Sequence, residues 1–363
     1  MRNFLKTAWS ACCFFLVALF LISCCSAYIS PERFSYITFF AIAFPYLFVL
    51  VLIVALISFF VKRSLAIMLL LVLVGGYSNL CRTIAFHAPQ QWQPERNDSA
   101  LRLFTWNVQY FGSIETGTYM DTEMIALIAD YEPDVVCMQE FSNTENGSRR
   151  ASIREEMNAA GYKFYFFSND RVIRPKNATV IDGVAIFSKL PFTDSARINI
   201  NKEQNENLIY TSVLFKNKPL RIYTGHLASF DLYKDTASSE KDIYQITYDR
   251  KTAIQYKLRE TEQLHQREVS IISKSISKSP YPVIYLGDMN ITPCSYNYRL
   301  LRNNFQDAFL EKGSGVGATF YKILPTLRID VCFADTSFRI NQCTVVKRRL
   351  SDHYPLVTDI SWK

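Results

Sequence analysis

The fold is decided by the stretch Val283-Ile284-Tyr285-Leu286-Gly287-Asp288-Met289-Asn290, in which an apolar run ends at a glycine, a carboxylate and a carboxamide. Alternate residues of a strand point to the same side, so this stretch predicts a buried strand that projects Asp288 and Asn290 together where the chain leaves the sheet. Functional groups of open α/β proteins gather at such strand ends. The pattern also fits a strand followed by an ordinary asparagine turn, so its meaning depends on the rest of the chain.

Two earlier segments are predicted to end in the same way. Residues 101–108 alternate apolar and polar side chains as a strand does, and Asn107 stands at their end. After a helical pattern at 122–130, the apolar run 133–140 ends at Glu140. A glutamate at the end of a buried strand costs free energy unless it has a partner, and the two candidate partners are a metal ion and a salt bridge.

Histidine and aspartate mark three later segments. His226 follows a predicted strand beside a glycine, where a lone histidine is more often structural than catalytic. Residues 327–333 are predicted to form a strand with Asp330 inside it. Near the C-terminus, Asp352 and His353 are adjacent and precede a final predicted strand.

The charge of the chain is unevenly distributed. Residues 1–87 contain six Lys and Arg residues and a single acid, Glu32. The remaining residues contain 34 basic and 32 acidic side chains, a net charge of +2 out of the +7 of the whole chain. The positive charge therefore belongs mainly to the flanks of apolar segments, and it is not the broad basic surface of a strong nucleic-acid binder.

Residues 1–85 are predicted to form a membrane anchor of three transmembrane helices. Thr7–Pro31 and Phe34–Val61 carry no charge, and each is longer than the roughly 20 residues that cross a bilayer. Ser64–Cys81 is a weaker third candidate, because it contains two glycines and several polar residues toward its end.

Basic flanks predict the orientation of the anchor. Arg2 and Lys6 precede the first apolar segment and Lys62-Arg63 follows the second, so the positive-inside rule places both flanks in the cytoplasm. If the third segment crosses, the rest of the chain lies outside; if it does not, the rest is cytoplasmic. We expect a multi-pass inner- or plasma-membrane protein whose catalytic domain faces the periplasm or exterior. Leu21-Ile22-Ser23-Cys24 also resembles a lipoprotein signal, which the further apolar segments disfavour.

Residues 86–100 are predicted to be a polar linker, and residues 101–363 a single catalytic domain. The cysteines of this domain include no CxxC pair, which argues against a zinc site or a redox motif. Whether any of them form a disulfide stays open at this point. They are Cys137, Cys294, Cys332 and Cys343.

Taken in order, the polar residues at these segment ends resemble the motifs of the endonuclease/exonuclease/phosphatase superfamily. The pair Gly287-Asp288-Met289-Asn290 and Ser351-Asp352-His353 is the most specific part, and the resemblance covers residues 101–363. The superfamily includes DNase I-like nucleases, exonuclease III-like repair enzymes, inositol polyphosphate 5-phosphatases and neutral sphingomyelinases. The full ordered set is Asn107, Glu140, His226, Asp288-x-Asn290, Arg328-Ile329-Asp330 and Ser351-Asp352-His353.

The resemblance implies a fold and a metal site. The implied fold is a DNase I-like, α/β four-layer sandwich of two mixed β-sheets flanked by helices, here in a membrane-anchored bacterial-type member with N-terminal transmembrane helices. It further implies that Glu140 is the metal carboxylate, that Asn107 is a supporting amide ligand and that Asp352 is a second acidic position near the metal. The expected ion is Mg²⁺, with Mn²⁺ as an alternative, because these ions prefer oxygen ligands.

The resemblance also implies catalytic roles. Asp288 matches the group that orients and deprotonates the attacking water, and Asn290 matches a residue that holds the water or the phosphate. His353 matches a histidine that hydrogen-bonds the scissile phosphate, and Asp330 matches the acid that fixes its tautomer. His226 matches a histidine that contacts the phosphate in DNase I-like and sphingomyelinase-like members.

We therefore expect a membrane-anchored, magnesium-dependent hydrolase that cleaves a phosphodiester. The substrate stays open between a phospholipid head group, a nucleic acid and another phosphate ester, as does the choice between diesterase and monoesterase. The bilayer is the other expected partner, through the N-terminal helices, and the sequence indicates no protein partner. The alternatives are an endonuclease acting on DNA or RNA and a non-catalytic, membrane-tethered binding module, which the intact set of polar residues disfavours.

Overall fold

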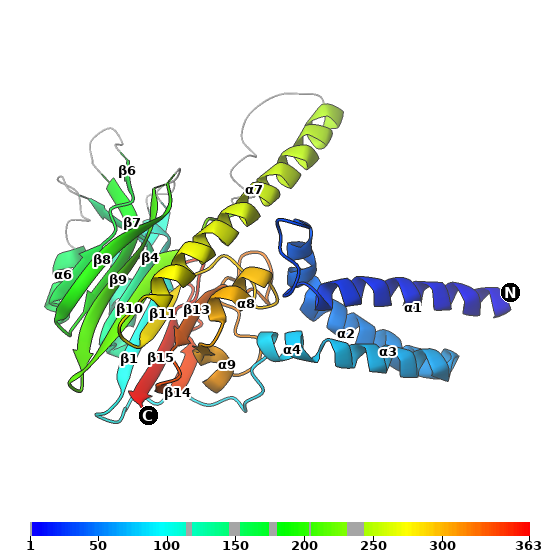
Figure 1. Cartoon of the computed structure of the whole chain (residues 1–363), viewed down its shortest axis with the longest axis horizontal. Helices are drawn as coiled ribbons and strands as arrows, with labels where there is room; N and C mark the ends of the chain where they lie inside the picture. Colours follow the sequence, from blue (N-terminus) through cyan, green and yellow to red (C-terminus); the bar gives the residue numbers. More distant parts are fainter. Residues whose placement is uncertain (1, 114–117, 145–152, 174–179, 203–204, 231–242) are drawn as a thin grey trace. The chain divides into compact units, whose positions relative to one another are not determined.

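The chain forms two compact units in a computed structural model, and each unit is described here by itself (Figure 1). The first unit comprises Met1–Ile84, Ser229–Gln266 and Ile291–Leu300, and the second comprises Ala85–Ala228, Arg267–Asn290 and Leu301–Lys363. The residues that the structure describes are 2–113, 118–144, 153–173, 180–202, 205–230 and 243–363.

The first unit contains the apolar helices. Among the described residues, Phe4–Cys24 and Ile37–Val61 are long and apolar enough to cross a membrane, and they indicate membrane association. A third candidate is a pair of shorter helices that is bent by 57° at its junction. The helices are α1 (Arg2–Cys24), α2 (Ile37–Val61), α3 (Arg63–Gly75) and α4 (Tyr77–Thr83).

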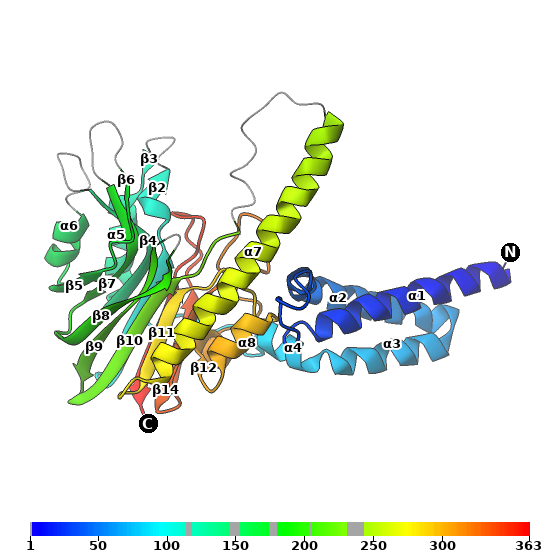
Figure 2. The same ribbon diagram turned by 45° about the horizontal axis from the view of Figure 1, so that its top comes forward.

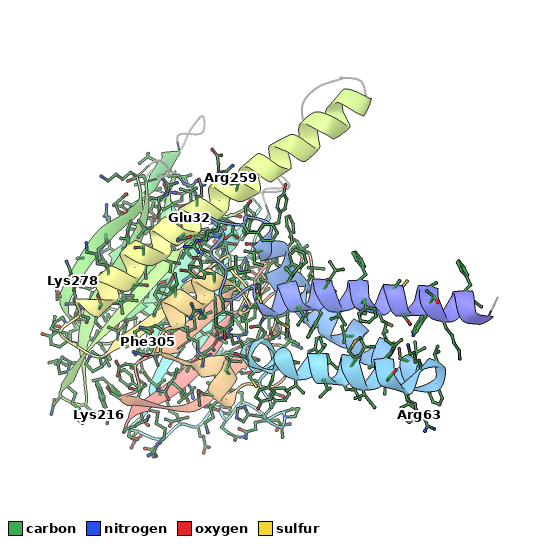
Figure 3. The ribbon with its side chains drawn as sticks, turned by 45° about the vertical axis from the view of Figure 1, so that its right-hand side comes forward. Glu32, Arg63, Lys216, Arg259, Lys278 and Phe305 are labelled. Atoms are coloured by element: carbon green, nitrogen blue, oxygen red, sulfur yellow. The ribbon has the colours of Figure 1, made fainter. Side chains whose placement is uncertain are left out.

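The two ends of this helical bundle differ in charge and in contacts. Arg63, at the junction of α2 and α3, lies at the same end as the chain's N-terminus, whereas Glu32 lies in the loop at the other end (Figure 3). At the Glu32 end, Ser26 Oγ donates to Cys294 O at 2.7 Å and Arg299 Nε donates to Ala27 O at 2.8 Å. The segment that contains α8 (Tyr296–Arg302) is therefore attached to the end opposite the basic flank.

The second unit is built on two mixed β-sheets. The first sheet has the order β14-β15-β1-β4-β7-β5, with β6 paired to β7, and its strands β1 and β4 are parallel. Its strands are β1 (Leu101–Asn107), β4 (Val135–Thr144), β5 (Phe164–Phe167), β6 (Arg171–Ile173), β7 (Val180–Ser188), β14 (Phe338–Val345) and β15 (Leu356–Trp362).

The second sheet has the order β12-β13-β11-β10-β9-β8, and its strands β10 and β11 are parallel. Its strands are β8 (Phe192–Asn201), β9 (Glu206–Phe215), β10 (Lys218–His226), β11 (Val283–Asp288), β12 (Gln306–Asp307) and β13 (Asp330–Ala334). The other elements of the second unit are η1 (Gln109–Phe111), the hairpin β2 (Gly112–Ser113) and β3 (Thr118–Tyr119), α5 (Asp121–Tyr131), α6 (Ile153–Ala159) and α9 (Ala308–Lys312). Helix α7 (Ile243–Ser277) belongs to the first unit as far as Gln266 and to the second from Arg267 onward.

Alternation along the strands divides the apolar side chains between two cores. Leu103 faces the space between the sheets, where it belongs to the same cluster as Leu286 of the other sheet. Trp106 points to the opposite face and packs in a cluster with Ile128 of α5. Helices α5 and α6 cover the first sheet, and the C-terminal part of α7 covers the second (Figure 2). The predicted four-layer α/β sandwich is confirmed.

A buried polar residue joins the two sheets. Gln139 of β4 donates from Nε2 to Thr105 Oγ1 at 3.1 Å and to Thr224 Oγ1 of β10 at 2.9 Å. Because a buried amide without partners is costly, these bonds favour one relative position of the two sheets. Gln139 thus links the sheets beside the strand ends that carry Asn107 and His226.

The cysteines form no disulfide, and all of them lie within the described residues. Cys137, Cys332 and Cys343 are buried in the second unit, and Cys343 Sγ accepts a hydrogen bond from Thr358 Oγ1. Burial raises the pKa of the Cys332 thiol to about 12, so this group stays protonated and unreactive.

The parallel pair β10–β11 yields a prediction about stability. Gly287 lies opposite Gly225, and a Cβ added at Gly287 would overlap the carbonyl oxygen of Gly225. We predict that Gly287→Ala lowers the free energy of unfolding by about 1–3 kcal/mol, because backbone cannot yield as a flexible side chain does. Thermal unfolding of the detergent-solubilised full-length protein measures this loss. Gly75→Ala is the matched control, since an added Cβ there meets nothing within 4 Å. An unchanged melting temperature in Gly287→Ala would contradict the close approach of the two strands.

Candidate active site

Three predicted site residues occupy one row across the second sheet. In the parallel pairing of β10 with β11, His226 lies opposite Asp288. In the antiparallel pairing of β11 with β13, Asp288 lies opposite Asp330. Directly opposed residues of neighbouring strands have side chains in contact distance on the same face. The strand register therefore brings together three residues that are far apart in the sequence.

A bulge in β4 directs Glu140 into the site. The pairing of β4 with β7 changes register between Met138 and Phe141, and Glu140 has a φ of 48°. A bulge inserts an extra residue and re-aims the local side chains, and a left-handed backbone is uncommon for a glutamate. Such strained positions cluster at functional sites. Glu140 consequently turns away from the ladder and toward Asn107 at the end of β1.

Asn107 joins carboxylates from the two sheets. Its Nδ2 donates to Glu140 Oε1 at 3.1 Å and to Asp288 Oδ2 at 3.0 Å. Its Oδ1 accepts the Gln109 backbone N–H at 3.0 Å, which determines the orientation of the amide. One carboxamide thus holds two acidic side chains at the same place.

Asn290 and His226 form the next part of the cluster. Asn290 adopts a left-handed backbone conformation, with a φ of 50°, and its Nδ2 donates to Leu227 O at 2.8 Å. The same nitrogen lies 3.1 Å from His226 Nε2, which in turn lies 3.7 Å from both Glu140 Oε1 and Asp288 Oδ2. Burial lowers the pKa of His226 even though Asp288 acts in the opposite direction. A neutral ring can accept the Asn290 N–H at Nε2.

His353 is held between two aspartates. Its Nδ1 lies 2.8 Å from Asp330 Oδ2, its Nε2 lies 3.6 Å from Asp288 Oδ2, and its carbonyl oxygen accepts the Trp106 indole N–H. Burial disfavours the His353 cation, but the two carboxylates outweigh that effect and raise its pKa to about 10. Burial and the neighbouring Asp330 raise the pKa of Asp288 to about 6. The pair thus combines a charged imidazolium with a carboxylate whose pKa lies close to neutral.

Asp352 reaches the cluster through Ser351. Ser351 Oγ lies 2.7 Å from Asn107 O and 3.1 Å from Asp352 Oδ1, and it accepts the His353 backbone N–H at 3.2 Å. All eight residues predicted from the sequence therefore belong to one connected group, in which Asp352 is linked to Asn107 through a hydroxyl.

The oxygen atoms at the Glu140 end fit a hard divalent cation. Glu140 Oε1 and Asp288 Oδ2 converge on one amide nitrogen, and the Glu140 side chain is 21% exposed, which leaves it open to solvent. Mg²⁺ prefers carboxylate oxygens of this kind, and to act as a further ligand Asn107 would have to turn its Oδ1 toward them in place of Nδ2. Asp288, Asp330 and His353 also present ligand atoms within 4.8 Å of one another. We interpret that second group as a hydrogen-bonded acid–histidine pair beside Asp288, because Asp330 occupies the Nδ1 side of the ring.

An arginine that no motif in the sequence singles out, Arg171, lies beside Glu140 and His226. Arg171 Nε lies 3.2 Å from Asp182 Oδ1, and its guanidinium also approaches Tyr110 Oη at 3.3 Å. In the sequence, Arg171 is marked only by the pair Asp170-Arg171, and its partner only by the pair Asp182-Gly183. Such pairs are common in loops, so they do not identify a functional site by themselves. A small pocket joins these residues to the site and is lined by Tyr110, Glu140, Asp170, Arg171, Asp182, Gly183, Val184, Glu206 and His226.

The fold and the residues at its strand ends define a DNase I-like α/β sandwich. A family model described as the Endonuclease/Exonuclease/phosphatase family matches residues 104–353, and the chain belongs to this family, whose members are hydrolases of phosphoester bonds. A second model, described as a domain of unknown function, matches residues 5–83. The comparison with curated proteins gives no match.

Solved structures have the same fold. An endonuclease/exonuclease/phosphatase from Beutenbergia cavernae is 20% identical over 73% of this chain and 72% of its own, with a TM-score of 0.56. The human Nocturnin catalytic domain with bound sulfate is 17% identical over 73% and 94%, with a TM-score of 0.52. A humanized D. rerio TDP2 is 18% identical over 73% and 100%, with a TM-score of 0.51. At these identities the likeness establishes the fold.

A buried glutamate in the pocket beside Arg171 predicts that the stability of the protein decreases as the pH rises. Glu206 Oε2 is buried and accepts no hydrogen bond in the described part of the chain, and burial together with Glu268 raises its pKa to about 8. Asp170 acts in the same direction and Arg171 against it. An unfolded glutamate titrates near pH 4.3. The folded protein therefore binds this proton more tightly, and stability falls as the pH rises from about 4.3 toward 8.

We expect Glu206→Gln to remove this loss, because an amide carries no charge that must be desolvated. At pH 8 the melting temperature of the variant should exceed that of the wild type by roughly 2–4 °C for each kcal/mol of unfolding free energy that the substitution restores. At pH 5 the difference in melting temperature should be smaller. Glu123→Gln, at an exposed position of α5, is the matched control. A gain of equal size at both pH values would contradict the raised pKa of Glu206.

Proposed function

We propose that this protein is a membrane-anchored, magnesium-dependent phosphodiesterase. Family membership supports a phosphoester as the bond that is hydrolysed. The observation that carries the proposal is the junction at Asn107, where Glu140 and Asp288 from two different sheets share one amide beside the Asp330–His353 pair. A structural ion pair does not need this combination of an amide, two carboxylates and a charged imidazole at the strand ends.

The proposed metal ligands are Glu140 and Asn107, with Asp352 in support. A divalent ion at this position, when bound, offsets the charge that develops on the phosphate oxygens during attack. Mg²⁺ suits the oxygen ligands, and Mn²⁺ is the alternative. The exposed side of Glu140 leaves this position open to ions from solution.

We assign the proton transfer from the attacking water to Asp288. Its raised pKa makes the carboxylate a better base than an ordinary aspartate, while it remains mostly ionised at neutral pH. Asn290, whose backbone N–H donates to Asp288 Oδ1 at 2.8 Å, holds the water or the phosphate beside it.

The two histidines are assigned to the phosphate. His353 as an imidazolium donates from Nε2, because Asp330 holds its other nitrogen and stabilises the charge. His226 is assigned a contact with the phosphate from the opposite side of Asp288. To donate to the anion, its Nε2 would carry a proton and would not accept the Asn290 N–H. Neither histidine needs to give up a proton for the attack to begin.

A second candidate function is that of an endonuclease acting on DNA or RNA. The specific observation in its favour is a groove beside strand β14 that is lined by exposed cations and by the tyrosines Tyr321 and Tyr354, the latter next to His353 in the chain. A phospholipid head group is the other candidate substrate, because the anchor holds the enzyme at a bilayer. The connected polar cluster argues against a non-catalytic binding module.

We further propose that the anchor is multi-pass and that the catalytic domain lies on the periplasmic or outer face. Lys62 and Arg63 lie at the bundle end that the positive-inside rule places in the cytoplasm. The hydrogen bonds from Ser26 and Arg299 support this orientation, because they attach the segment 291–300 to the other end. The bent pair α3–α4 then serves as the third, broken span.

The proposed reaction predicts a metal-dependent activity that needs Asp288. The full-length protein in detergent should hydrolyse bis(p-nitrophenyl) phosphate with Mg²⁺ and lose this activity with EDTA. Asp288→Asn should lower kcat by about 10²–10⁴-fold, because the amide cannot accept the proton of water. Initial rates on the diester and on p-nitrophenyl phosphate also separate a diesterase from a monoesterase.

Glu123→Gln again serves as the control for the loss of one carboxylate. The variant Glu140→Gln, which removes a proposed metal ligand, should raise the Mg²⁺ concentration that gives the half-maximal rate. Hydrolysis that persists in EDTA, or that is unchanged in Asp288→Asn, would contradict the proposed mechanism.

The proposed orientation predicts the behaviour of reporters fused after Lys363. In a bacterial host, C-terminal alkaline phosphatase should be active and C-terminal green fluorescent protein should be dark, because the former matures in the periplasm and the latter in the cytoplasm. Deletion of residues 63–83 should reverse both results. A fluorescent, phosphatase-inactive full-length fusion would place the catalytic domain in the cytoplasm instead.

A further inference from the structure

A large groove lies beside edge strand β14, on the second unit. It has a volume of about 1260 Å³, and we call it the linker groove because residues 89–100 form one of its walls. The glycine-rich loop Gly313–Gly317 forms another wall, and Arg339 and Asn341 of β14 are among its lining residues. None of the residues assigned to catalysis or to the metal lines this groove.

The wall formed by the linker is fixed to the domain. Gln342 of β14 accepts the Gln93 backbone N–H at 3.1 Å and donates to Gln93 O at 3.0 Å. Before this point, Ala85 pairs with Gly315 as a β-bridge, and Ser314 Oγ donates to His87 O at 2.8 Å. The linker is thus attached to the domain on both sides of residues 89–91, which line the groove between these points.

The exposed charges of the linker groove are mainly positive. Four exposed cations line it, and none of them forms an ion pair with a carboxylate of the described residues: Lys312, Arg339, Lys347 and Arg349. Against these four cations stands one exposed acid, Glu95.

The other acidic lining residue is already neutralised. Asp359 is buried and accepts two hydrogen bonds from Arg102, at 2.8 and 2.9 Å. The remaining lining cation, Arg96, is paired with Asp134 at 2.6 Å. The charges left for a ligand therefore favour an anion.

An aromatic pair connects the linker groove to the loop of His353. Tyr321 and Tyr354 both line the groove and stack with their ring centroids 4.6 Å apart. Arg349 lies 5.3 Å from the Tyr321 ring and donates to Tyr354 Oη at 3.3 Å. Tyr354 follows His353 directly in the chain, and Tyr321 Oη donates to Ser351 O at 2.7 Å. A ligand stacked on this pair lies next to the proposed phosphate-binding histidine.

We propose that the linker groove binds single-stranded nucleic acid that flanks a phosphodiester held at His353. This inference rests on the proposed function and specifies its substrate class. Proteins that bind single strands combine a basic channel for the phosphates with aromatic rings on which bases stack. The four exposed cations supply the first feature, and Tyr321 with Tyr354 supplies the second. A duplex needs a broader basic surface than a domain region with a net charge of +2 offers.

Binding of a labelled oligonucleotide tests the proposal without relying on hydrolysis. The probe is a fluorescein-labelled oligothymidylate, mixed with the full-length protein in detergent and EDTA, and the readout is fluorescence anisotropy. The double variant Arg339→Glu/Lys347→Glu should bind at least about tenfold more weakly and lower the slope of log K against log salt by roughly 1.4, since two phosphate contacts are lost. Tyr321→Ala should weaken binding by about tenfold through the loss of one stacked base.

The matched control is Lys216→Glu/Lys278→Glu, which makes the same charge change at two positions outside the groove (Figure 3). Its affinity should stay within about twofold of wild type in high salt, where long-range charge effects are screened. Thermal unfolding of each variant confirms that it is folded. Equal losses in the two double variants would overturn the proposal, because net charge alone would then explain binding.

A second arm separates nucleic acid from lipid. The full-length protein is reconstituted in phosphatidylcholine nanodiscs, which hold the apolar helices, and sedimentation with added vesicles of phosphatidylcholine and phosphatidylserine then reports binding to an anionic membrane surface. Vesicle binding that depends on Arg339 and Lys347, without oligonucleotide binding, would overturn the proposal in favour of a lipid surface. Groove-dependent oligonucleotide binding without any hydrolysis of bis(p-nitrophenyl) phosphate would support the groove and contradict the proposed function.

Discussion

Two carboxylates that share one amide, one of them buried and the other partly exposed, are the constraint on which this structure depends. Asp288 is almost fully buried, and it lies next to Glu140 at the meeting point of two sheets. Like charges in a buried place repel each other unless a donor or a cation holds them together. Asn107, His353 and an ion at Glu140 are the groups that would meet this need. The site is thus stabilised by the same contacts that prepare it for a charged substrate.

The rest of the second unit maintains that arrangement. Gln139 holds the sheets in one relative position, and the Gly225–Gly287 approach lets β10 and β11 lie side by side with His226 and Asp288 in register. The bulge that carries Glu140 is a local departure from regular pairing, and the surrounding core compensates for it. A rigid sandwich can hold a few strained residues at its end, and it can thereby keep charged side chains close together where little water reaches them.

The two functional proposals place different demands on the same domain. Hydrolysis needs the cluster around Asp288, whereas recognition of a long anionic substrate needs the linker groove and its exposed cations. The sequence predicts only a polar linker at residues 86–100, and hydrogen bonds between Gln93 and Gln342 make this linker a wall of that groove. Under these two proposals, the segment that follows the apolar helices in the chain also lines the groove that would bind the substrate.

The sequence by itself determined the apolar helices, the strand that ends at Asp288, and the polar residues at the ends of the other strands. These features depend on local periodicity and on which residue types a buried strand end tolerates, so one chain is enough to find them. The eight predicted site residues came from the order of these polar residues along the chain and from its resemblance to a known superfamily. Their roles in metal binding and catalysis remain proposals.

The tertiary structure alone decided which of these residues meet and which others join them. Strand pairing placed Asp288 between His226 and Asp330, the bulge turned Glu140 inward, and edge strand β14 came to line the linker groove. Neither Arg171 nor Tyr321 has a distinctive local motif. Each is a candidate functional residue only because of its neighbours, Arg171 beside Glu140 and Tyr321 in the linker groove. The physical reason is that register, bulges and grooves arise from contacts between segments far apart in the chain, and a local pattern contains no information about its distant partners.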